Sequence, residues 1–373
     1  MKRILFITST FRKGGLTNVL YSLAKNLNKS LFDVTILTLS QNPPNFEKSF
    51  FVNLDNVKLI SLGLSRIRGL FFGVSETQKI IDKLKPDVIH SHGIRGDGIL
   101  SKIKTTARKI ATVHGFIDED YIMSYGKIKG TLMYKADLSY LKKMSVCVGC
   151  SKSVADYVKQ KFNLQNIIGI PNGIETTKYF PVSEEKKLRL RKKLLVPENA
   201  VIWFTTGKLT QIKQPLFMIR QWLRHKDLLS KHHLYILGMG EQYDECLKLS
   251  RDHDNIHLTG RVDNVEEYLQ AGDYYISASR SEGFSLAILE AMSCGLPLLL
   301  TDIPAYREVL SSGKNLGLSY KLDDEKDFFD KLQKIFNLDK NAARNSAIEA
   351  AKNEFSAEKM TERYVKAYCS ETD

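Results

Sequence analysis

The sequence predicts an α/β fold of two Rossmann-like domains, each built on a parallel sheet covered by helices. The chain has 373 residues, which is long enough to bury two substantial cores. Short apolar segments of strand length alternate with amphipathic segments of helical periodicity. Because this alternation runs as two separate series with a polar, charged stretch between them, we expect two domains.

The first series predicts an N-terminal domain over residues 1–170. It begins with the strand RILFIT at 3–8, a glycine loop, and the amphipathic helix VLYSLAKNL at 19–27. Later strand segments, with helical segments between them, are DVTILTL (33–39), DVIHSH (87–92), KIATVH (109–114) and SVCVGCS (145–151). Cys147 and Cys150 form a CxxC pair, but no second pair completes a zinc site. We therefore expect these two thiols to be structural residues at the end of a buried strand.

The second series predicts a C-terminal domain over residues 171–350. Its strand segments are AVIWFTT (200–206), HLYILGMG (233–240), NIHLTG (255–260), YYISAS (274–279) and LPLLLTD (296–302). The join between the domains lies near residues 171–195, where a Pro-Asn-Gly turn leads into the charged run EEKKLRLRKK (184–193). We expect this run to form a solvated helix face. Residues 351–373 are expected to form the closing helix.

The composition is that of a soluble protein of a reducing compartment. Five cysteines in a long chain give no disulfide framework. No apolar run approaches the ~20 residues that span a bilayer. The N-terminal ILFI is too short for a signal peptide and leads into polar residues. These features predict a cytoplasmic protein.

The net charge of +13 belongs to the first half of the chain. Residues 1–170 hold 26 Lys and Arg against 12 Asp and Glu, whereas the remainder holds 29 against 30. This asymmetry predicts an anionic partner for the first half: a membrane surface, a nucleic acid or a phosphorylated acceptor.

The segment EGFSLAILEAMSCGLP at 282–297 is the strongest candidate for a ligand site. If a helix begins at Ser285, its N–H groups and positive dipole end bind an anion. Glu290 then lies further along that helix, where a carboxylate accepts hydrogen bonds from a diol, and Glu282 stays in the loop for a second polyol. A phosphate between two hydroxylated rings is a nucleotide sugar, so the segment predicts binding of a nucleotide sugar.

Other candidate residues follow predicted strands, at the sheet edge where α/β folds bind ligands. Lys208 and Lys213, five residues apart, suit the two phosphates of a nucleoside diphosphate; two solvated surface lysines are the alternative. His114 suits a sugar contact or a structural role. Gly14 and Gly15 fit either a close backbone approach to a ligand or a plain tight turn.

The segment at 282–297 resembles the signature of the retaining GT-B glycosyltransferases of family 4, in which two glutamates separated by seven residues grip the donor. The rest of the chain resembles the family in order. The matching segments are ILFITSTFRKGGLTNVLYSLAKNL, VIHSHG, IATVHGF, PNGIETTKYFP, WFTTGKLTQIKQP and the closing FSAEKMTERYVKAY.

This resemblance implies the GT-B fold, in which two Rossmann-like domains face each other across a cleft and the last helix crosses back to the first domain. It implies an acceptor-binding first domain and a nucleotide-sugar-binding second domain that close on the donor. The residues it gives catalytic roles are His114, Lys208, Lys213 and Glu282. The donor-binding residues it implies are Gly14, Gly15, Gly207, Lys208, Lys213, Gly238, Arg261, Val262, Glu282, Gly283, Phe284, Ser285, Leu286 and Glu290.

We expect no cofactor and no essential metal ion. The triplets Asp118-Glu119-Asp120 and Asp252-His253-Asp254 match the DxD metal motif of the other glycosyltransferase fold, but neither ends a predicted strand. Lysines and a helix N-terminus already supply the positive charge that a metal would bring. Gly238-Met239-Gly240 lacks the third glycine of a dinucleotide fingerprint and is expected to line the base and ribose pocket.

The expected reaction is transfer of a hexose or N-acetylhexosamine from a nucleotide sugar, with UDP favoured over GDP, to a lipid-linked or oligosaccharide acceptor. Residues 121–143 and the cluster of Arg66, Arg68, Phe71 and Phe72 combine basic and apolar side chains, which favours a peripheral enzyme on an anionic membrane. An ordinary amphipathic helix is the alternative for these segments. Alternative functions are a nucleotide-sugar epimerase, a phosphorylase on the same fold, or a non-catalytic protein that binds an anionic polymer; no motif indicates nucleic-acid binding.

Overall fold

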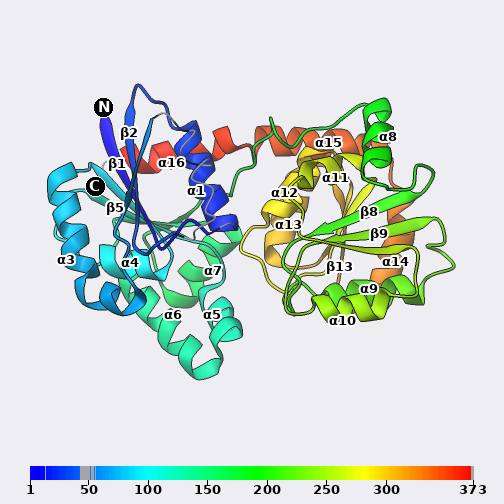
Figure 1. Cartoon of the computed structure of the whole chain (residues 1–373), viewed down its shortest axis with the longest axis horizontal. Helices are drawn as coiled ribbons and strands as arrows, with labels where there is room; N and C mark the ends of the chain where they lie inside the picture. The colour runs from blue at the N-terminus through cyan, green and yellow to red at the C-terminus, as the bar shows by residue number, and fades with distance from the viewer. Residues whose placement is uncertain (13, 43–50, 52–53, 55, 371–373) are drawn as a thin grey trace. The chain divides into compact units, whose positions relative to one another are not determined.

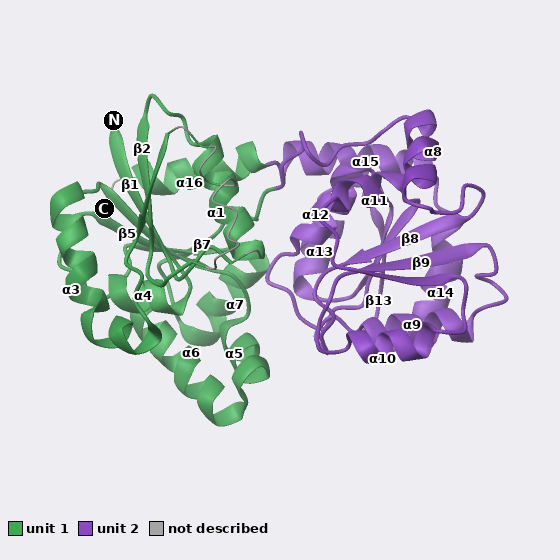
Figure 2. Cartoon of the chain, in the orientation of Figure 1, with its two compact units in different colours: residues 1–173, 357–373 green, residues 174–356 purple. Residues whose placement is uncertain are grey.

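The computed structural model describes residues 1–12, 14–42, 51, 54 and 56–370, and it divides into two compact units (Figure 2). Unit 1 comprises Met1–Gly173 and Ala357–Asp373, and unit 2 comprises Ile174–Ser356. Each unit contains one parallel sheet flanked by helices, so the predicted pair of α/β domains is confirmed (Figure 1). Residue 13 of the predicted glycine loop and residues 371–373 of the predicted closing helix lie outside the described residues.

The sheet of unit 1 has the strand order β3-β2-β1-β4-β5-β6-β7, and its strands pair in parallel. The strands are β1 (Lys2–Thr8), β2 (Phe32–Thr38), β3 (Val57–Ser61), β4 (Val88–His92), β5 (Arg108–Val113), β6 (Val146–Gly149) and β7 (Ile167–Gly169). Five of these strands, β1, β2, β4, β5 and β6, match the segments expected from their apolar residues. Cys147 lies within β6, Cys150 directly follows this strand, and both side chains are buried.

The helices of unit 1 follow its strands in the alternation that the sequence predicts. They are α1 (Gly15–Asn26), α3 (Arg66–Leu84), α4 (Ile94–Leu100), α5 (Ile117–Tyr125), α6 (Lys127–Leu141), α7 (Lys152–Phe162) and, from the C-terminus, α16 (Ala357–Cys369). Helix α16, red in Figure 1, packs beside α1. The closing helix therefore belongs to the first domain, as expected.

Buried polar contacts fix α16 to the sheet of unit 1. The Nδ1 atom of His90 on β4 lies 2.9 Å from the hydroxyl of Tyr368, and its Nε2 atom lies 2.7 Å from the hydroxyl of Thr112. Thr112 in turn lies 3.0 Å from the hydroxyl of Tyr364. Because these buried groups satisfy one another, they stabilise a single position of the helix. His90 is therefore a structural histidine.

The sheet of unit 2 has the strand order β10-β9-β8-β11-β12-β13, again in parallel. Its strands are β8 (Val201–Thr206), β9 (His232–Leu237), β10 (Ile256–Gly260), β11 (Tyr274–Ser277), β12 (Leu298–Thr301) and β13 (Gly317–Tyr320). Its helices are α8 (Glu184–Lys193), α9 (Pro215–Arg224), α10 (Tyr243–Ser250), α11 (Val265–Ala271), α12 (Leu286–Ser293), α13 (Pro304–Leu310), α14 (Glu325–Ile335) and α15 (Lys340–Asn353). Trp203 of β8 stacks on Tyr274 of β11 with a centroid separation of 4.4 Å, and both belong to the buried hydrophobic core of this unit.

Helix α8 is only partly the solvated face that its charges predicted. Arg191 is 4% exposed, and Lys187 is largely buried. Both side chains pair with the carboxylate of Asp273, each at 2.6 Å, and the Ile202 N–H donates to the same carboxylate at 2.7 Å. The prediction was wrong at these two positions because a charge run does not reveal which cations meet a buried acid across the fold.

Replacing Asp273 by Asn is expected to destabilise unit 2 by about 3–5 kcal/mol, because it leaves a buried arginine without its counter-ion. Burial by itself raises the pKa of Asp273, but Lys187, Arg191 and the Ile202 N–H together hold it below its usual 3.8. This stabilisation is therefore present above pH 3.8 and is lost as the pH falls through the lowered pKa.

Urea denaturation at neutral and at acidic pH measures this effect. The exposed pair of Arg189 and Glu185 on the same helix supplies the control, since Glu185→Gln should change the stability by less than about 1 kcal/mol. Equal effects of the two substitutions at neutral pH would contradict the assignment.

Candidate active site

Two loops of unit 2 meet where the strand order of its sheet reverses. Strand β8 lies between β9 and β11, so the connections after β8 and β11 leave toward opposite sides. Such a reversal opens a crevice at the carboxyl ends of the strands, which is where open α/β sheets bind ligands. The loop after β8 carries Gly207, Lys208 and Lys213, and the loop after β11 carries Glu282 and Ser285. Sequence segments about 70 residues apart thus converge at one place.

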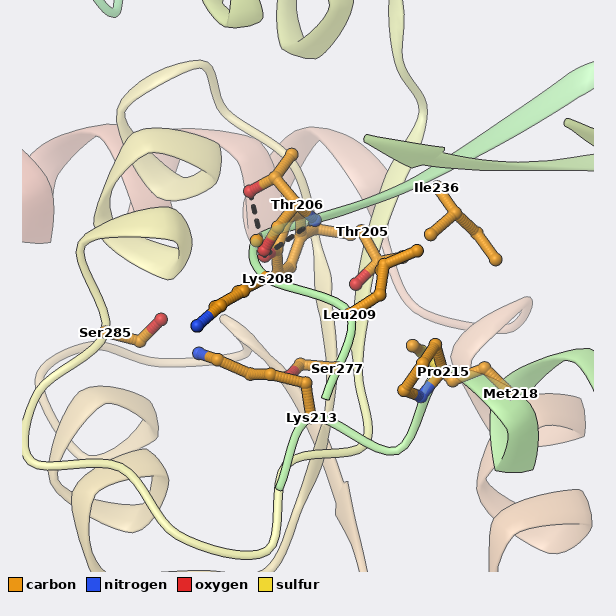
Figure 3. A pocket seen from close by; sticks show the side chains of 12 residues that line it. Thr205, Thr206, Lys208, Leu209, Lys213, Pro215, Met218, Ile236, Ser277 and Ser285 are labelled. Carbon is orange, nitrogen blue, oxygen red and sulfur yellow. Dashed lines mark hydrogen bonds between the residues drawn. The ribbon is translucent and has the colours of Figure 1, made fainter. Parts of the chain in front are cut away.

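A small pocket lies between these loops (Figure 3). Its lining includes Gly207, Lys208, Lys213 and Ser285, together with Tyr275 from β11. The two lysine side chains extend toward Ser285 and leave a volume of about 10 Å³. A group as large as a phosphate fits this pocket only if the flexible lysine side chains move aside.

Lys213 and Glu282 form an ion pair that ties the two loops together. The same carboxylate oxygen, Oε1 of Glu282, accepts a hydrogen bond from the Ser279 hydroxyl at 2.9 Å and from the Tyr306 hydroxyl at 3.2 Å. The Glu282 side chain is 13% exposed. These contacts hold the carboxylate in a fixed orientation. Sequence reasoning missed Tyr306, because a tyrosine on a helix 24 residues later carries no local sign of this contact.

Helix α12 begins at Leu286, and Ser285 is its N-cap, as the sequence predicted. The Ser285 side chain makes no capping hydrogen bond, so it leaves the N–H groups of the first turn for another acceptor. Ser285 lines the pocket, which places the positive end of the helix dipole beside the two lysines. Phe284 next to it is buried against Phe355, with ring centroids 5.4 Å apart, and anchors the loop. Its neighbour Gly283 lies in the same loop.

Glu290 lies on the second turn of α12, where burial raises the pKa of its carboxyl to about 7 despite a hydrogen bond with Tyr179. Lys178 lowers this pKa and Glu266 raises it, and both effects are smaller than that of burial. Tyr179 is buried and lies in the segment PNGIETTKYFP before α8, which resembles the family but in which no site residue was predicted. Keeping an ionisable carboxyl group buried costs folding free energy. Carboxyl groups with raised pKa values of this kind are typical of functional sites.

Gly238 and Gly240, in the loop after β9, are required because the backbone of the loop after β8 packs directly against them. A Cβ on Gly238 would lie 1.8 Å from the Gly207 carbonyl oxygen, and one on Gly240 would lie 2.1 Å from the Leu209 carbonyl oxygen. Gly238 therefore positions the loop that carries Lys208. Arg261 and Val262 follow β10 at the same edge of the sheet, where the Gly238 N–H donates to the Gly260 carbonyl oxygen at 2.8 Å.

In unit 1, Gly14 caps the start of α1 and Gly15 is its first residue. Both are exposed, and a Cβ on Gly14 would meet no atom within 4 Å. The backbone of Gly14 is extended, so neither strain nor packing demands glycine there. The exposed backbone at this position is therefore open to close approach from the solvent side.

His114 follows β5 and lies beside His92, with 3.1 Å between His114 Nε2 and His92 Nδ1. Burial lowers the pKa of His114 to about 4 and that of His92 well below its usual value. Both rings are therefore neutral at neutral pH, and a single proton lies between them. His114 can donate or accept a hydrogen bond, but it is not a cation there.

Neither acidic triplet forms the carboxyl end of a strand. Asp118, in the first turn of α5, accepts hydrogen bonds from Tyr157 at 2.8 Å and from Lys161 at 2.7 Å. Asp252 and Asp254 lie exposed in the loop after α10. Within the described ranges, no group of three or more His, Cys, Asp or Glu side chains could hold a metal ion.

Two sequence profiles match this chain. The Glycosyltransferase Family 4 profile matches residues 13–178, and the profile of Glycosyl transferases group 1 matches residues 200–337. An O-antigen biosynthesis glycosyltransferase of Escherichia coli, WclY, is 26% identical over 232 residues, which are 60% of this chain and 63% of that protein. The chain thus spans less than two thirds of this relative. The UDP-Gal:alpha-D-GlcNAc-diphosphoundecaprenol alpha-1,3-galactosyltransferase of Escherichia coli is 24% identical over 353 residues, covering 90% of this chain and 89% of the relative.

Solved structures share the fold of the whole chain. Sucrose-phosphate synthase of Thermosynechococcus elongatus superposes with a TM-score of 0.82 at 15% identity, covering 99% of this chain and 98% of that one. HepE of Anabaena, in complex with UDP and glucose, superposes with a TM-score of 0.81 at 15% identity, covering 98% and 99%. The predicted GT-B fold class is confirmed by these likenesses. With the profiles matching both units, the chain belongs to the group 1, or family 4, glycosyltransferases.

Proposed function

We propose that this glycosyltransferase moves a hexose or N-acetylhexosamine from a UDP-sugar to a lipid-linked or oligosaccharide acceptor in the synthesis of a surface polysaccharide. The observation that carries the proposal is the convergence of Lys208, Lys213 and the start of α12 on one pocket, with Glu282 tied to Lys213. Two cations and a helix N-terminus suit a diphosphate, and a fixed carboxylate suits the hydroxyls of the sugar attached to it.

The choice of a UDP-sugar and of a lipid-linked acceptor rests on relatives. HepE has been solved with UDP-glucose, and the galactosyltransferase relative is named for UDP-Gal and for a diphosphoundecaprenol acceptor. A relative from Campylobacter jejuni is likewise named for a diphospho-undecaprenol acceptor and an N-acetylgalactosaminyl group. In this proposal Glu290 accepts hydrogen bonds from the ribose diol, and the loops with Gly238, Arg261 and Val262 line the base.

The proposed reaction retains the configuration of the anomeric carbon, as the family resemblance implies. The bond from the anomeric carbon to the diphosphate oxygen breaks, the acceptor oxygen bonds to the same face of that carbon, and the hydroxyl proton passes to the leaving phosphate. Lys208, Lys213 and the N–H groups near Ser285 and Leu286 stabilise the charge that develops on the diphosphate, and each such contact contributes about 3 kcal/mol to the barrier reduction. Neutral His114 supplies a hydrogen bond to a sugar hydroxyl, and the Gly14-Gly15 backbone allows close approach of the ligand.

A transfer assay tests the proposal. UDP-glucose, UDP-galactose and their N-acetylated counterparts, all α-linked donors, are offered with undecaprenyl-diphosphate-linked N-acetylglucosamine in the presence and absence of EDTA. We expect one α-linked product, detected by NMR of its anomeric proton, at a rate that EDTA does not change. Lys213→Ala should lower kcat/KM by about 100-fold or more, because it removes one diphosphate contact.

Lys226→Ala is the matched control, since this exposed lysine lies outside the pocket. A β-linked product would contradict retention. Conversion of the UDP-sugar without an acceptor would favour an epimerase, and dependence on inorganic phosphate would favour a phosphorylase.

We propose in addition that unit 1 binds an anionic membrane surface through its basic and apolar helices. On α3, Ile67, Leu70 and Phe71 are 71%, 82% and 76% exposed, beside exposed Arg66 and Arg68. On α6, Ile128 and Leu132 are 82% and 67% exposed among exposed lysines. Apolar side chains that remain in water beside cations suit the boundary of an anionic bilayer. In the described part of the chain, no helix has the length and hydropathy to cross a membrane.

Flotation with vesicles of phosphatidylglycerol and phosphatidylethanolamine measures this binding. We expect the wild type to float with these vesicles and a smaller fraction of it to float at high salt. With vesicles of pure phosphatidylcholine we expect it to remain unbound. The double substitution Leu70→Ser and Phe71→Ser should reduce the bound fraction at least about tenfold, because it removes two exposed apolar side chains that would insert into the membrane interface. Leu195→Ser with Leu247→Ser, which changes two exposed leucines of unit 2, should have no effect. Equal flotation of both double variants would contradict the proposal.

A further inference from the structure

One oxygen of the Glu282 carboxylate carries its contacts to the rest of unit 2. Lys213 pairs with Oε1, and the hydroxyls of Ser279 and Tyr306 donate to the same atom at 2.9 Å and 3.2 Å. The other oxygen, Oε2, accepts no hydrogen bond from the residues that the structure describes, and it is open to solvent. A ligand can therefore reach Oε2 without displacing the contacts of Oε1.

The two hydroxyls that meet Glu282 are buried donors. Ser279 is 0% exposed and Tyr306 is 1% exposed. Each hydroxyl carries one proton, and an ionised carboxylate only accepts, so both protons point at Oε1. Burial, followed by the charge of Glu282, raises the pKa of Tyr306 well above its usual value, which keeps this proton on the tyrosine at neutral pH.

Ser277 joins these two residues in a hydroxyl network, which consists of Ser277, Ser279 and Tyr306. The Ser277 hydroxyl lies 2.9 Å from the hydroxyl of Tyr306 and 3.2 Å from that of Ser279. Because both neighbours give their own protons to Glu282, Ser277 is the donor within the network. Ser277 is the last residue of β11 and lines the pocket beside Lys213 (Figure 3).

The sheet of unit 2 holds this network in place. Thr301 on β12 donates to the Ser279 carbonyl oxygen at 2.6 Å, and Tyr320 on β13 donates to the Ser277 carbonyl oxygen at 3.1 Å. Lys213, by contrast, reaches Glu282 with a long side chain from the loop after β8. The hydroxyl contacts of Glu282 are therefore the rigid ones, and the lysine contact is the one that can move.

The two kinds of contact respond differently to a bound diphosphate. In the proposed function Lys213 meets the phosphates and gives up its pairing with Glu282. The Glu282 side chain is only 13% exposed, and a carboxylate in such a place is costly to the fold once its cation leaves. Hydrogen bonds that remain on the charged group offset part of this cost.

We propose that Ser279 and Tyr306 are positioning residues that hold Glu282 by Oε1 when Lys213 moves to the diphosphate, so that Oε2 accepts a hydrogen bond from a hydroxyl of the donor sugar. The role of Oε2 rests on the proposed function, which assigns the donor sugar to Glu282. The hydroxyl network then contributes to the binding of the sugar but not to the binding of the nucleotide.

Calorimetry on the whole chain measures the contribution of the sugar. The probes are UDP, UDP-glucose, UDP-galactose and the two N-acetylated UDP-sugars, and the measured quantity is the Kd of UDP divided by the Kd of the tightest UDP-sugar. Tyr306→Phe should lower this ratio about tenfold and leave the Kd of UDP unchanged, because Glu282 loses one of the donors that orient it. In a Glu282→Gln background, the same substitution should not change the ratio further.

Tyr274→Phe is the matched control. It removes a buried hydroxyl from β11 whose oxygen has no hydrogen-bond partner among the described residues, so it should change neither Kd. A variant that is merely less stable weakens UDP and the UDP-sugar alike, so the ratio separates positioning from a general loss of folding.

Thermal melts without ligand test the hold on Glu282 independently of the proposed function. Lys213→Ala imitates the departure of the lysine and leaves Glu282 with its two hydroxyl donors. Tyr306→Phe should lower the melting temperature by about 2–4 °C more in the Lys213→Ala background than in the wild type, because a single donor then remains on the carboxylate.

Equal ratios of the two Kd values in the wild type and in Tyr306→Phe would overturn the proposal. Equal effects of Tyr306→Phe on the melting temperature in both backgrounds would overturn it too, because the network would then not hold Glu282 in the absence of Lys213. A chain that shows the expected melting temperatures but binds neither UDP nor any UDP-sugar would sustain the hold of the network on Glu282 while refuting the proposed function, and with it the role of Oε2.

Discussion

The reversal of strand order between β8 and β11 is the constraint on which the proposed donor site depends. The connections after these two strands leave in opposite directions at the carboxyl edge of the sheet, and the start of α12 lines the pocket between them. The Lys213–Glu282 ion pair then joins the two loops. A ligand that carries both a diphosphate and hydroxyls can replace this pairing, because its phosphates meet the lysine and its hydroxyls meet the carboxylate.

The proposed donor site combines two kinds of polar chemistry. The pocket of unit 2 combines two lysines with a helix N-terminus, which suits negative charge. The buried hydroxyls of Ser279 and Tyr306 hold the carboxylate of Glu282, which suits the hydroxyl groups of a sugar. Burial lowers the pKa of His114 in unit 1 and raises the pKa of Tyr306 in unit 2, so both groups are neutral at neutral pH and act through hydrogen bonds.

The sequence predicted the fold better than it predicted the surroundings of each site. Strands such as β1 and β11 follow from short apolar runs, and the N-cap at Ser285 follows from the segment around it. Tyr306 on Glu282 and the partners of Asp273 could not be predicted, because these contacts join residues that only the folded chain brings together. Local periodicity reports burial along one element, whereas sites depend on several elements.

The affinity for UDP-glucose as a function of pH, measured by calorimetry, tests the proposed nucleotide-sugar site most directly. UDP-glucose has no terminal phosphate that titrates near neutral pH. A change of its affinity with pH in this range therefore reports the titration of a group of the protein. Because burial raises the pKa of Glu290 to about 7, its carboxyl group is charged above that pH, and in the proposed complex it then accepts the strongest hydrogen bonds from the ribose hydroxyls. The account predicts that the wild type binds UDP-glucose roughly tenfold more tightly at one to two pH units above 7 than at one to two pH units below 7. For Glu290→Gln it predicts weaker binding whose affinity does not change with pH. Binding of equal strength in both proteins at every pH would contradict the assignment of Glu290 and the site built around it.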